Sequence, residues 1–212
     1  PGFGVANDIA LLPCWHDETK MRDRMNWDMW AQLCADNEPF GARRTSYVEL
    51  FLDGQYWGVY VMIEPVDVTG ELALAGEGRL FTDSVYRTLP ARNIEAHRPV
   101  LAKPGSDGTV FELRYAPAGV SARAALNRFT PYVKMGDSTR ELMTDEEFAA
   151  LCEKSTDIDE MLDYFLFVQA ASLGHDNYFN NVYLWALWDG DHYVYHLSPW
   201  DLDLAFIRMF GN

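Results

Sequence analysis

The sequence predicts an α+β fold, because helix and strand signals occupy separate blocks of its 212 residues. Helical spacing of apolar residues occurs at 17–36 and 144–176. Two hairpin patterns, each with an Asp-Gly turn, occur at 46–65 and 180–198. The order is helix, hairpin, mixed region, helices, hairpin, which differs from the regular strand–helix alternation of a parallel α/β sheet.

The first helix is expected over residues 17–36, with Asp17 or Thr19 as its cap. Asn37, Pro39 and Gly41 follow it and would end it. Four apolar residues recur at every fourth position, and we expect this stripe to pack in the core: Met21, Met25, Met29 and Leu33.

The clearest local signal is the hairpin SYVELFLDGQYWGVYVMIEP, in which two β-rich runs flank Asp53-Gly54. This dipeptide favours a tight type I′ turn. The return strand is predicted from Tyr56 to Ile63, and Pro65 would stop it.

The later part of the chain gives mixed signals. Residues 67–120 indicate an extended, irregular region, with short strand candidates within 70–84 and 108–117. Two helices are expected at 144–154 and 156–176, each opened by a Thr-Asp cap. The second start, Thr156 to Asp159, resembles a capping box, and Gly174 would be its C′ residue.

The composition limits the function classes. Apolar residues make up 49% of the chain, as in globular proteins, and the formal net charge of −15 argues against general nucleic-acid binding. No apolar run is long enough to cross a bilayer, and no signal peptide is present in this segment. The chain does not begin with Met, so we expect an internal piece of a longer protein. Cys14, Cys34 and Cys152 fit no metal or disulfide pattern and are expected to be mostly buried thiols.

Polar side chains gather just before the last hairpin, in the loop that contains His175, Asp176, Asn177, Asn180 and Asn181. The hairpin then leads to HLSPWDLDLAF, where two aspartates stand among apolar residues. Carboxylates in such a setting need a hydrogen-bond partner, an ion pair or a metal. Because an antiparallel hairpin brings its ends together, the polar loop before the hairpin and the two aspartates after it should be neighbours.

The expected neighbours are Asn181 and Asp201. An Asp, an Asn five residues later, a hairpin and a closing Asp is the order used by protein kinases. Here Asp176 would accept or orient the substrate hydroxyl proton, and Asn181 and Asp201 would offer hard oxygen ligands to Mg²⁺. Asp203 would assist or hold a second metal. The alternative is plain turn chemistry in the loop, with Asp203 as a helix cap.

Three segments together resemble the CotH kinase family, the spore-coat secreted atypical protein kinases: YVELFLDGQYWGVYVMIEPVD, HDNYFNN and PWDLDLAF. The resemblance spans about residues 8 to 206 and implies a two-lobed kinase-like fold. It also implies ATP, Mg²⁺ or Mn²⁺, and transfer of phosphate to proteins, with coat or surface proteins as candidates. A secreted or spore-surface location follows from the family alone.

The resemblance also assigns places along the chain. Residues 1–66 would be part of the N-lobe, with the helix 17–36 at the position of αC and the Asp53-Gly54 hairpin as strands 4 and 5. The hinge that meets adenine would be Glu64, Pro65 and Val66; for Glu64, a plain strand end is an equal alternative. Residues 67–212 would be part of the C-lobe.

Two parts of a kinase have no counterpart in this sequence, namely the first strands with their Lys and the end of the C-lobe. No Lys stands on a strand before the first helix, so we expect a fragment without the first strands and without the end of the C-lobe. Arg22 and Arg24 could reach phosphate, although solvated helix charge is the simpler interpretation.

Two other functions are open. A non-catalytic pseudokinase or binding domain could use Trp57, Trp188 and Trp200 to recognise carbohydrate or surface proteins. A metal-dependent hydrolase would use Asp176, Asp201 and Asp203, but the His residues lack a zinc-ligand spacing.

Overall fold

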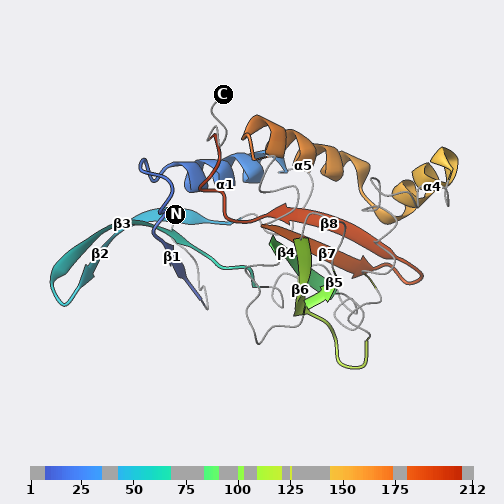
Figure 1. Cartoon of the computed structure of the whole chain (residues 1–212), viewed down its shortest axis with the longest axis horizontal. Helices are drawn as coiled ribbons and strands as arrows, with labels where there is room; N and C mark the ends of the chain where they lie inside the picture. Colours follow the sequence, from blue (N-terminus) through green and yellow to red (C-terminus); the bar gives the residue numbers. More distant parts are fainter. Residues whose placement is uncertain are drawn as a thin grey trace.

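The computed structural model shows three helices and eight strands among the residues it describes, which agrees with the predicted α+β class (Figure 1). The described residues are 8–34, 43–67, 84–90, 100–102, 109–120, 125, 144–173 and 181–206. All strand pairs are antiparallel and form two separate sheets. Within these residues no helix combines the length and the apolar character needed to cross a membrane.

The first sheet has the order β1-β3-β2 and contains the predicted hairpin. Its strands are β1 (Ala10–Leu12), β2 (Thr45–Leu52) and β3 (Gln55–Ile63). Asp53 and Gly54 have φ values of 51° and 77°, the two positive values that a type I′ turn requires. The hairpin is confirmed, whereas β1 lies before the first predicted helix, in a stretch for which no strand was predicted.

The second sheet has the order β5-β6-β4-β7-β8. Its strands are β4 (Ser84–Pro90), β5 (Val100–Ala102), β6 (Thr109–Tyr115), β7 (Val182–Trp188) and β8 (Tyr193–Pro199). The strand candidate within 108–117 is confirmed as β6. The candidate within 70–84 lies almost entirely outside the described residues, and β4 begins at its last residue. The loop between β7 and β8 is closed by a bond from Asp189 N to His192 O.

The helix α1 (Arg22–Leu33) begins five residues later than predicted. The prediction for its apolar stripe is wrong: Met21, Met25 and Leu33 are 55%, 43% and 39% exposed, and only Met29 packs against the core. Met21 and Met25 help line a surface hollow of about 440 Å³ between α1 and β2. The buried face consists instead of Asp23, Asn26, Trp27 and Trp30.

The cap of α4 (Asp145–Ser155) is confirmed, because Thr144 and Glu147 form a complete capping box. The cap of α5 (Ile158–Ala170) differs from the prediction. Thr156 ends α4, and the Asp157 side chain accepts the first amides of α5, from Asp159 and Glu160.

The C-terminal end of α5 also differs from the prediction. Ser172 has a φ of 55° and takes the C′ position that was expected for Gly174, which lies outside the described residues. Leu173 N then bonds to Val168 O at 2.9 Å, the long bond of a Schellman motif.

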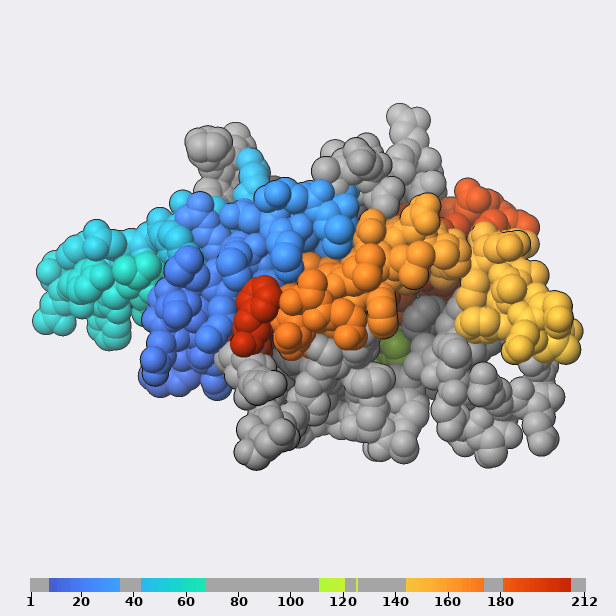
Figure 2. Space-filling view, turned by 90° about the horizontal axis from the view of Figure 1, so that it is seen from above, coloured from blue at the N-terminus to red at the C-terminus, as the bar shows by residue number. Residues whose placement is uncertain are grey.

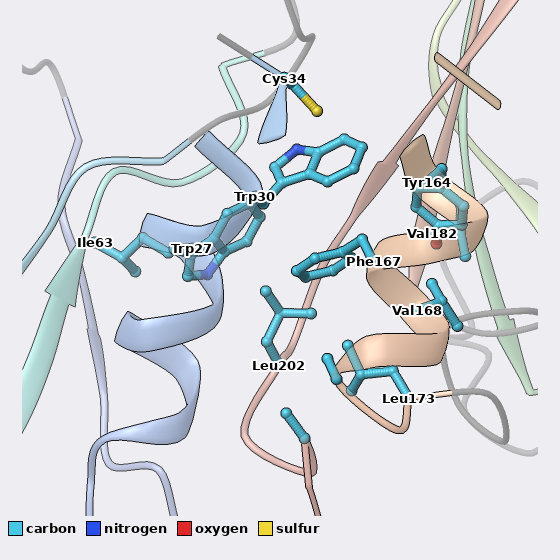
Figure 3. Close-up of a cluster of buried hydrophobic side chains, with 12 residues drawn as sticks. Trp27, Trp30, Cys34, Ile63, Tyr164, Phe167, Val168, Leu173, Val182 and Leu202 are labelled. Atoms are coloured by element: carbon cyan, nitrogen blue, oxygen red, sulfur yellow. The ribbon is translucent and has the colours of Figure 1, made fainter. Parts of the chain in front are cut away.

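The main core joins α1, α5 and the first sheet. Trp30 of α1 lies near Phe167 of α5, and Leu202 lies between the two helices (Figure 3). Trp30 contacts Phe167 with ring centroids 5.1 Å apart. Figure 2 shows α1 and α5 on one face, with the last described residues between them. The segment that contains Asp201 and Asp203 is therefore anchored by both helices.

The strand β7 is buried on both faces, which fixes the hairpin that leads to the candidate site. Leu184 and Ala186 pack in one apolar cluster, and Tyr183, Trp185 and Leu187 pack in another. Buried apolar surface contributes roughly 25 cal/mol per Å² to stability. The β7–β8 hairpin is thus a rigid support for the residues at its base.

Candidate active site

The base of the β7–β8 hairpin brings Asn181 and Asp201 together, as predicted. The last ladder pair is Val182 with Pro199, and one step further Trp200 N donates to Asn181 O at 2.8 Å. Asn181 Nδ2 lies 3.4 Å from Asp201 Oδ2. Two residues twenty positions apart thus present an amide and a carboxylate side by side.

Both residues have left-handed backbone conformations, with φ values of 53° for Asn181 and 59° for Asp201. Side chains with a Cβ atom disfavour this region, and Asn and Asp tolerate it best after Gly. Such conformations are concentrated at functional sites, where the surrounding structure imposes them. Here the closed hairpin on one side and the core on the other impose them.

The helix α1 adds a third acidic residue, Asp23, which the sequence analysis missed. Its Oδ1 accepts the amide of Leu202 at 2.9 Å in a buried contact that spans 179 positions. Asp23 is only 1% exposed, and its Oδ2 has no hydrogen-bond partner among the described residues. A single sequence gives no signal for so distant a contact.

The surroundings of Asp23 change its proton affinity. Burial raises the pKa of its carboxyl group to about 7, and the negative charges of Asp201 and Asp203 add to the rise. The Leu202 amide opposes the rise by stabilising the charged form. The indole N–H of Trp27 acts in the same direction, although it makes no hydrogen bond of normal geometry. The charges of Asp201 and Asp203 therefore act directly on the Asp23 carboxyl group.

The loop before α1 fixes the first turn of the helix, where Asp23 lies. The buried Asp17 accepts from the Thr19 hydroxyl (2.6 Å) and from the amides of Thr19 (3.0 Å) and Arg22 (2.7 Å). The Arg22 guanidinium lies 3.3 Å from it. Burial alone would raise the pKa of Asp17, but these hydrogen bonds hold it below its usual range. Arg22 is therefore paired within the fold and is not a solvated charge.

The comparison with known families gives a decisive result. The model of the family described as CotH kinase protein matches residues 1–211. The chain belongs to the CotH kinase family. A comparison with curated proteins gave no match. The resemblance inferred from the hairpin, loop and closing motifs is confirmed.

In this CotH family chain, the described residues contain part of the predicted site. His175, Asp176, Asn177 and Asn180 lie outside them, so their positions stay predictions. Asn181 and Asp201 lie together, and Asp203 lies in the partly buried turn that follows. The residues Asp203–Phe206 form turns rather than a helix, so the helix-cap alternative for Asp203 has no support within them.

The donor set of the CotH family chain fits a hard divalent cation. No three His, Cys, Asp or Glu side chains in the described part of the chain are placed to hold a metal. Mg²⁺, however, keeps several waters and is usually held by one or two carboxylates together with substrate phosphates. The Asn181 amide oxygen and the Asp201 carboxylate match that requirement. The nearby thiol does not compete, because burial, with Asp23 and Asp203, raises the pKa of Cys14 to about 12.

The segment predicted as the hinge follows β3. Glu64 forms a two-contact ion pair with Arg44, and Pro65 O accepts from the Arg43 guanidinium at 3.4 Å. Val66 packs against the cluster of Tyr183, Trp185 and Leu187 on β7. In this family member the segment thus borders the hairpin that carries Asn181 and Asp201. The ion pair of Glu64 with Arg44 is a structural contact, and the hinge role of Glu64 stays a prediction.

Proposed function

We propose that this chain is part of an ATP- and divalent-metal-dependent phosphotransferase that acts on protein side chains. The observation that supports this proposal most directly is the pairing of Asn181 with Asp201 at the base of a rigid hairpin. Membership in the CotH kinase family supports the same reaction class.

Each residue has a proposed role. Asp176 accepts or orients the hydroxyl proton of the substrate, with His175, Asn177 and Asn180 supporting its loop. Asn181 and Asp201 hold Mg²⁺ or Mn²⁺, and Asp203 assists them. When bound, the metal neutralises charge on the ATP phosphates.

The proposed lobes are 1–66 and 67–212, joined at the hinge Glu64, Pro65 and Val66, whose backbone would meet adenine. The substrates we propose are coat or other surface proteins, which places the protein outside the cell or on the spore.

The test is ATP turnover by the full-length protein with Mg²⁺ or Mn²⁺. Asp176→Ala should lower turnover about 10²- to 10⁴-fold, the usual loss when a general base is removed. Asp201→Ala should lower turnover and raise the metal concentration needed for half-maximal rate. Asp28→Ala is the control, because Asp28 is exposed and its carboxylate lies 4.0 Å from Arg24 on the outer surface of α1. Full turnover in both site variants would disprove the assigned roles.

A second candidate is a non-catalytic binding domain, favoured by the exposed aromatic residues of the β2–β3 hairpin. Phe51, Tyr56 and Trp57 are each more than half exposed, and the Phe51 and Tyr56 rings are 5.2 Å apart. Of the other Trp residues considered, Trp188 packs on Tyr193 and Trp200 on Trp27, as expected for core residues. Calorimetry of the full-length protein with ATP and Mg²⁺ separates the two functions. Nucleotide binding would favour the phosphotransferase, and its absence would favour the binding domain.

A further inference from the structure

The turn that carries Asp201 and Asp203 is held at several points. Before Asp201, the Trp200 ring packs edge-on against Trp27 of α1, with centroids 6.1 Å apart, and also against Tyr183. After Asp201, the side chain of Leu202 is fully buried between α1 and α5 (Figure 3). Asp201 is therefore the one residue of this tripeptide that is exposed.

The far end of the turn is attached to α5. Ala205 is fully buried in the same core cluster, and Phe206 N donates to Ala171 O at 2.7 Å. Within the turn, Ala205 N bonds to Leu202 O at 3.2 Å. The two acids are thus presented from a short segment whose ends belong to the core.

The Leu202 amide is the point where α1 bonds directly to the turn backbone. Leu202 lies outside any helix or strand and is buried, so its amide needs an acceptor from elsewhere in the fold, and a buried amide without one is destabilising. Asp23 Oδ1 accepts this amide at 2.9 Å and so satisfies it. Without Asp23, the amide would have to turn toward another acceptor, and Asp201 and Asp203 on either side would move with it.

We infer that Asp23 is a positioning residue: by holding the Leu202 amide, it fixes the turn that presents Asp201 and Asp203 to the metal. This inference rests on the proposed function, and it adds a residue of α1 that neither the family motifs nor the hairpin identifies. Asp23 would not contact the metal or the substrate.

The test uses the full-length protein and two variants of one side chain. Asp23→Ala removes the acceptor, whereas Asp23→Asn keeps an acceptor oxygen at the same position. NMR should show that the Leu202 amide exchanges with solvent about tenfold faster in Asp23→Ala, because its buried hydrogen bond is lost. In Asp23→Asn, which keeps a neutral acceptor, the exchange rate should stay close to that of the wild type. The control is Asp28→Ala on the exposed face of the same helix.

The second readout is the Mn²⁺ concentration that gives half-maximal ATP turnover. Loss of a residue that orients a metal ligand typically weakens metal affinity 10- to 100-fold. We expect that rise in Asp23→Ala and its rescue in Asp23→Asn. A merely structural role would lower the melting temperature and leave the half-saturating Mn²⁺ concentration of the folded protein unchanged.

The outcomes separate the two proposals. Wild-type Leu202 exchange in Asp23→Ala would overturn the inference, and so would an unchanged metal requirement. Should Asp23→Ala not fold, Asp23→Leu replaces it, because it removes the acceptor while filling a similar volume in the core, and the same two results would overturn the inference. Absence of metal-dependent turnover in the wild type would count against the phosphotransferase, while the exchange rates would still decide whether Asp23 holds the turn.

Discussion

Glu160 of α5 and His196 of β8 face each other across the interface between helix and hairpin, with Oε2 and Nδ1 2.5 Å apart. Both side chains are largely buried, at 8% and 16% exposure. The pair ties α5 to the hairpin whose base carries Asn181 and Asp201. The pair therefore helps to support the candidate site, although it is not one of the residues proposed to bind metal.

The first prediction concerns this pair. Glu160→Ala removes the carboxylate that bonds to the His196 ring, and loss of one partner of a buried hydrogen bond costs about 1–3 kcal/mol. We expect a loss of this order in the free energy of unfolding, measured by urea denaturation. Glu153→Ala, an exposed Glu on α4, should cost less than about 0.5 kcal/mol. Equal effects of the two changes would show that the contact contributes nothing.

The second prediction separates backbone strain from chemistry at Asp201. Its φ of 59° favours Gly, because a Cβ atom costs about 1–2 kcal/mol in this region. Asp201→Gly should therefore be more stable to thermal unfolding than Asp201→Ala, while both lose metal-dependent turnover. If the alanine variant were the more stable of the two, the left-handed conformation at this position would be wrong.

The third prediction concerns the cap of α5. Asp157 accepts the amides of Asp159 and Glu160, so Asp157→Ala should lower the free energy of unfolding by about 0.5–2 kcal/mol. Asp145→Ala is a suitable comparison: Asp145 stands in the first turn of α4 but is not its cap, so a smaller loss is expected. Chemical denaturation of the two variants measures the difference, and a larger loss in Asp145→Ala would contradict it.

The sequence predicted those features that depend on local signals. The Asp53-Gly54 turn fixed the first hairpin, and hairpin geometry alone was sufficient to place Asn181 next to Asp201. The buried face of α1 could not be chosen in this way, because Met21-Met25-Met29 and Asp23-Trp27-Trp30 both follow helical spacing. Packing of the Trp residues against α5 decides between these two faces, and that contact is tertiary.

The site was predictable only in part for the same reason. Asp23 stands in a helix rich in charged residues, so its sequence context resembles a solvated surface. It is buried because the segment around Leu202, at the other end of the chain, packs against it and donates an amide to its carboxyl group. The cap of α5 was misplaced by one residue because Thr156 and Asp157 are both good caps, and the end of α4 uses the first.

The fourth prediction concerns pH. The folded chain raises the pKa of Asp23 from 3.8 to about 7, so between these values the folded state binds more protons than the unfolded state. Stability from this group is therefore fully present below about pH 4 and decreases as the pH rises toward 7. Each pH unit between the two pKa values lowers the free energy of unfolding by about 1.4 kcal/mol. Asp23→Asn, which keeps the bond to Leu202 but cannot ionise, should lack this slope. Urea denaturation of both proteins from pH 4 to pH 8 measures it, and parallel curves would show that Asp23 ionises as an ordinary carboxyl group.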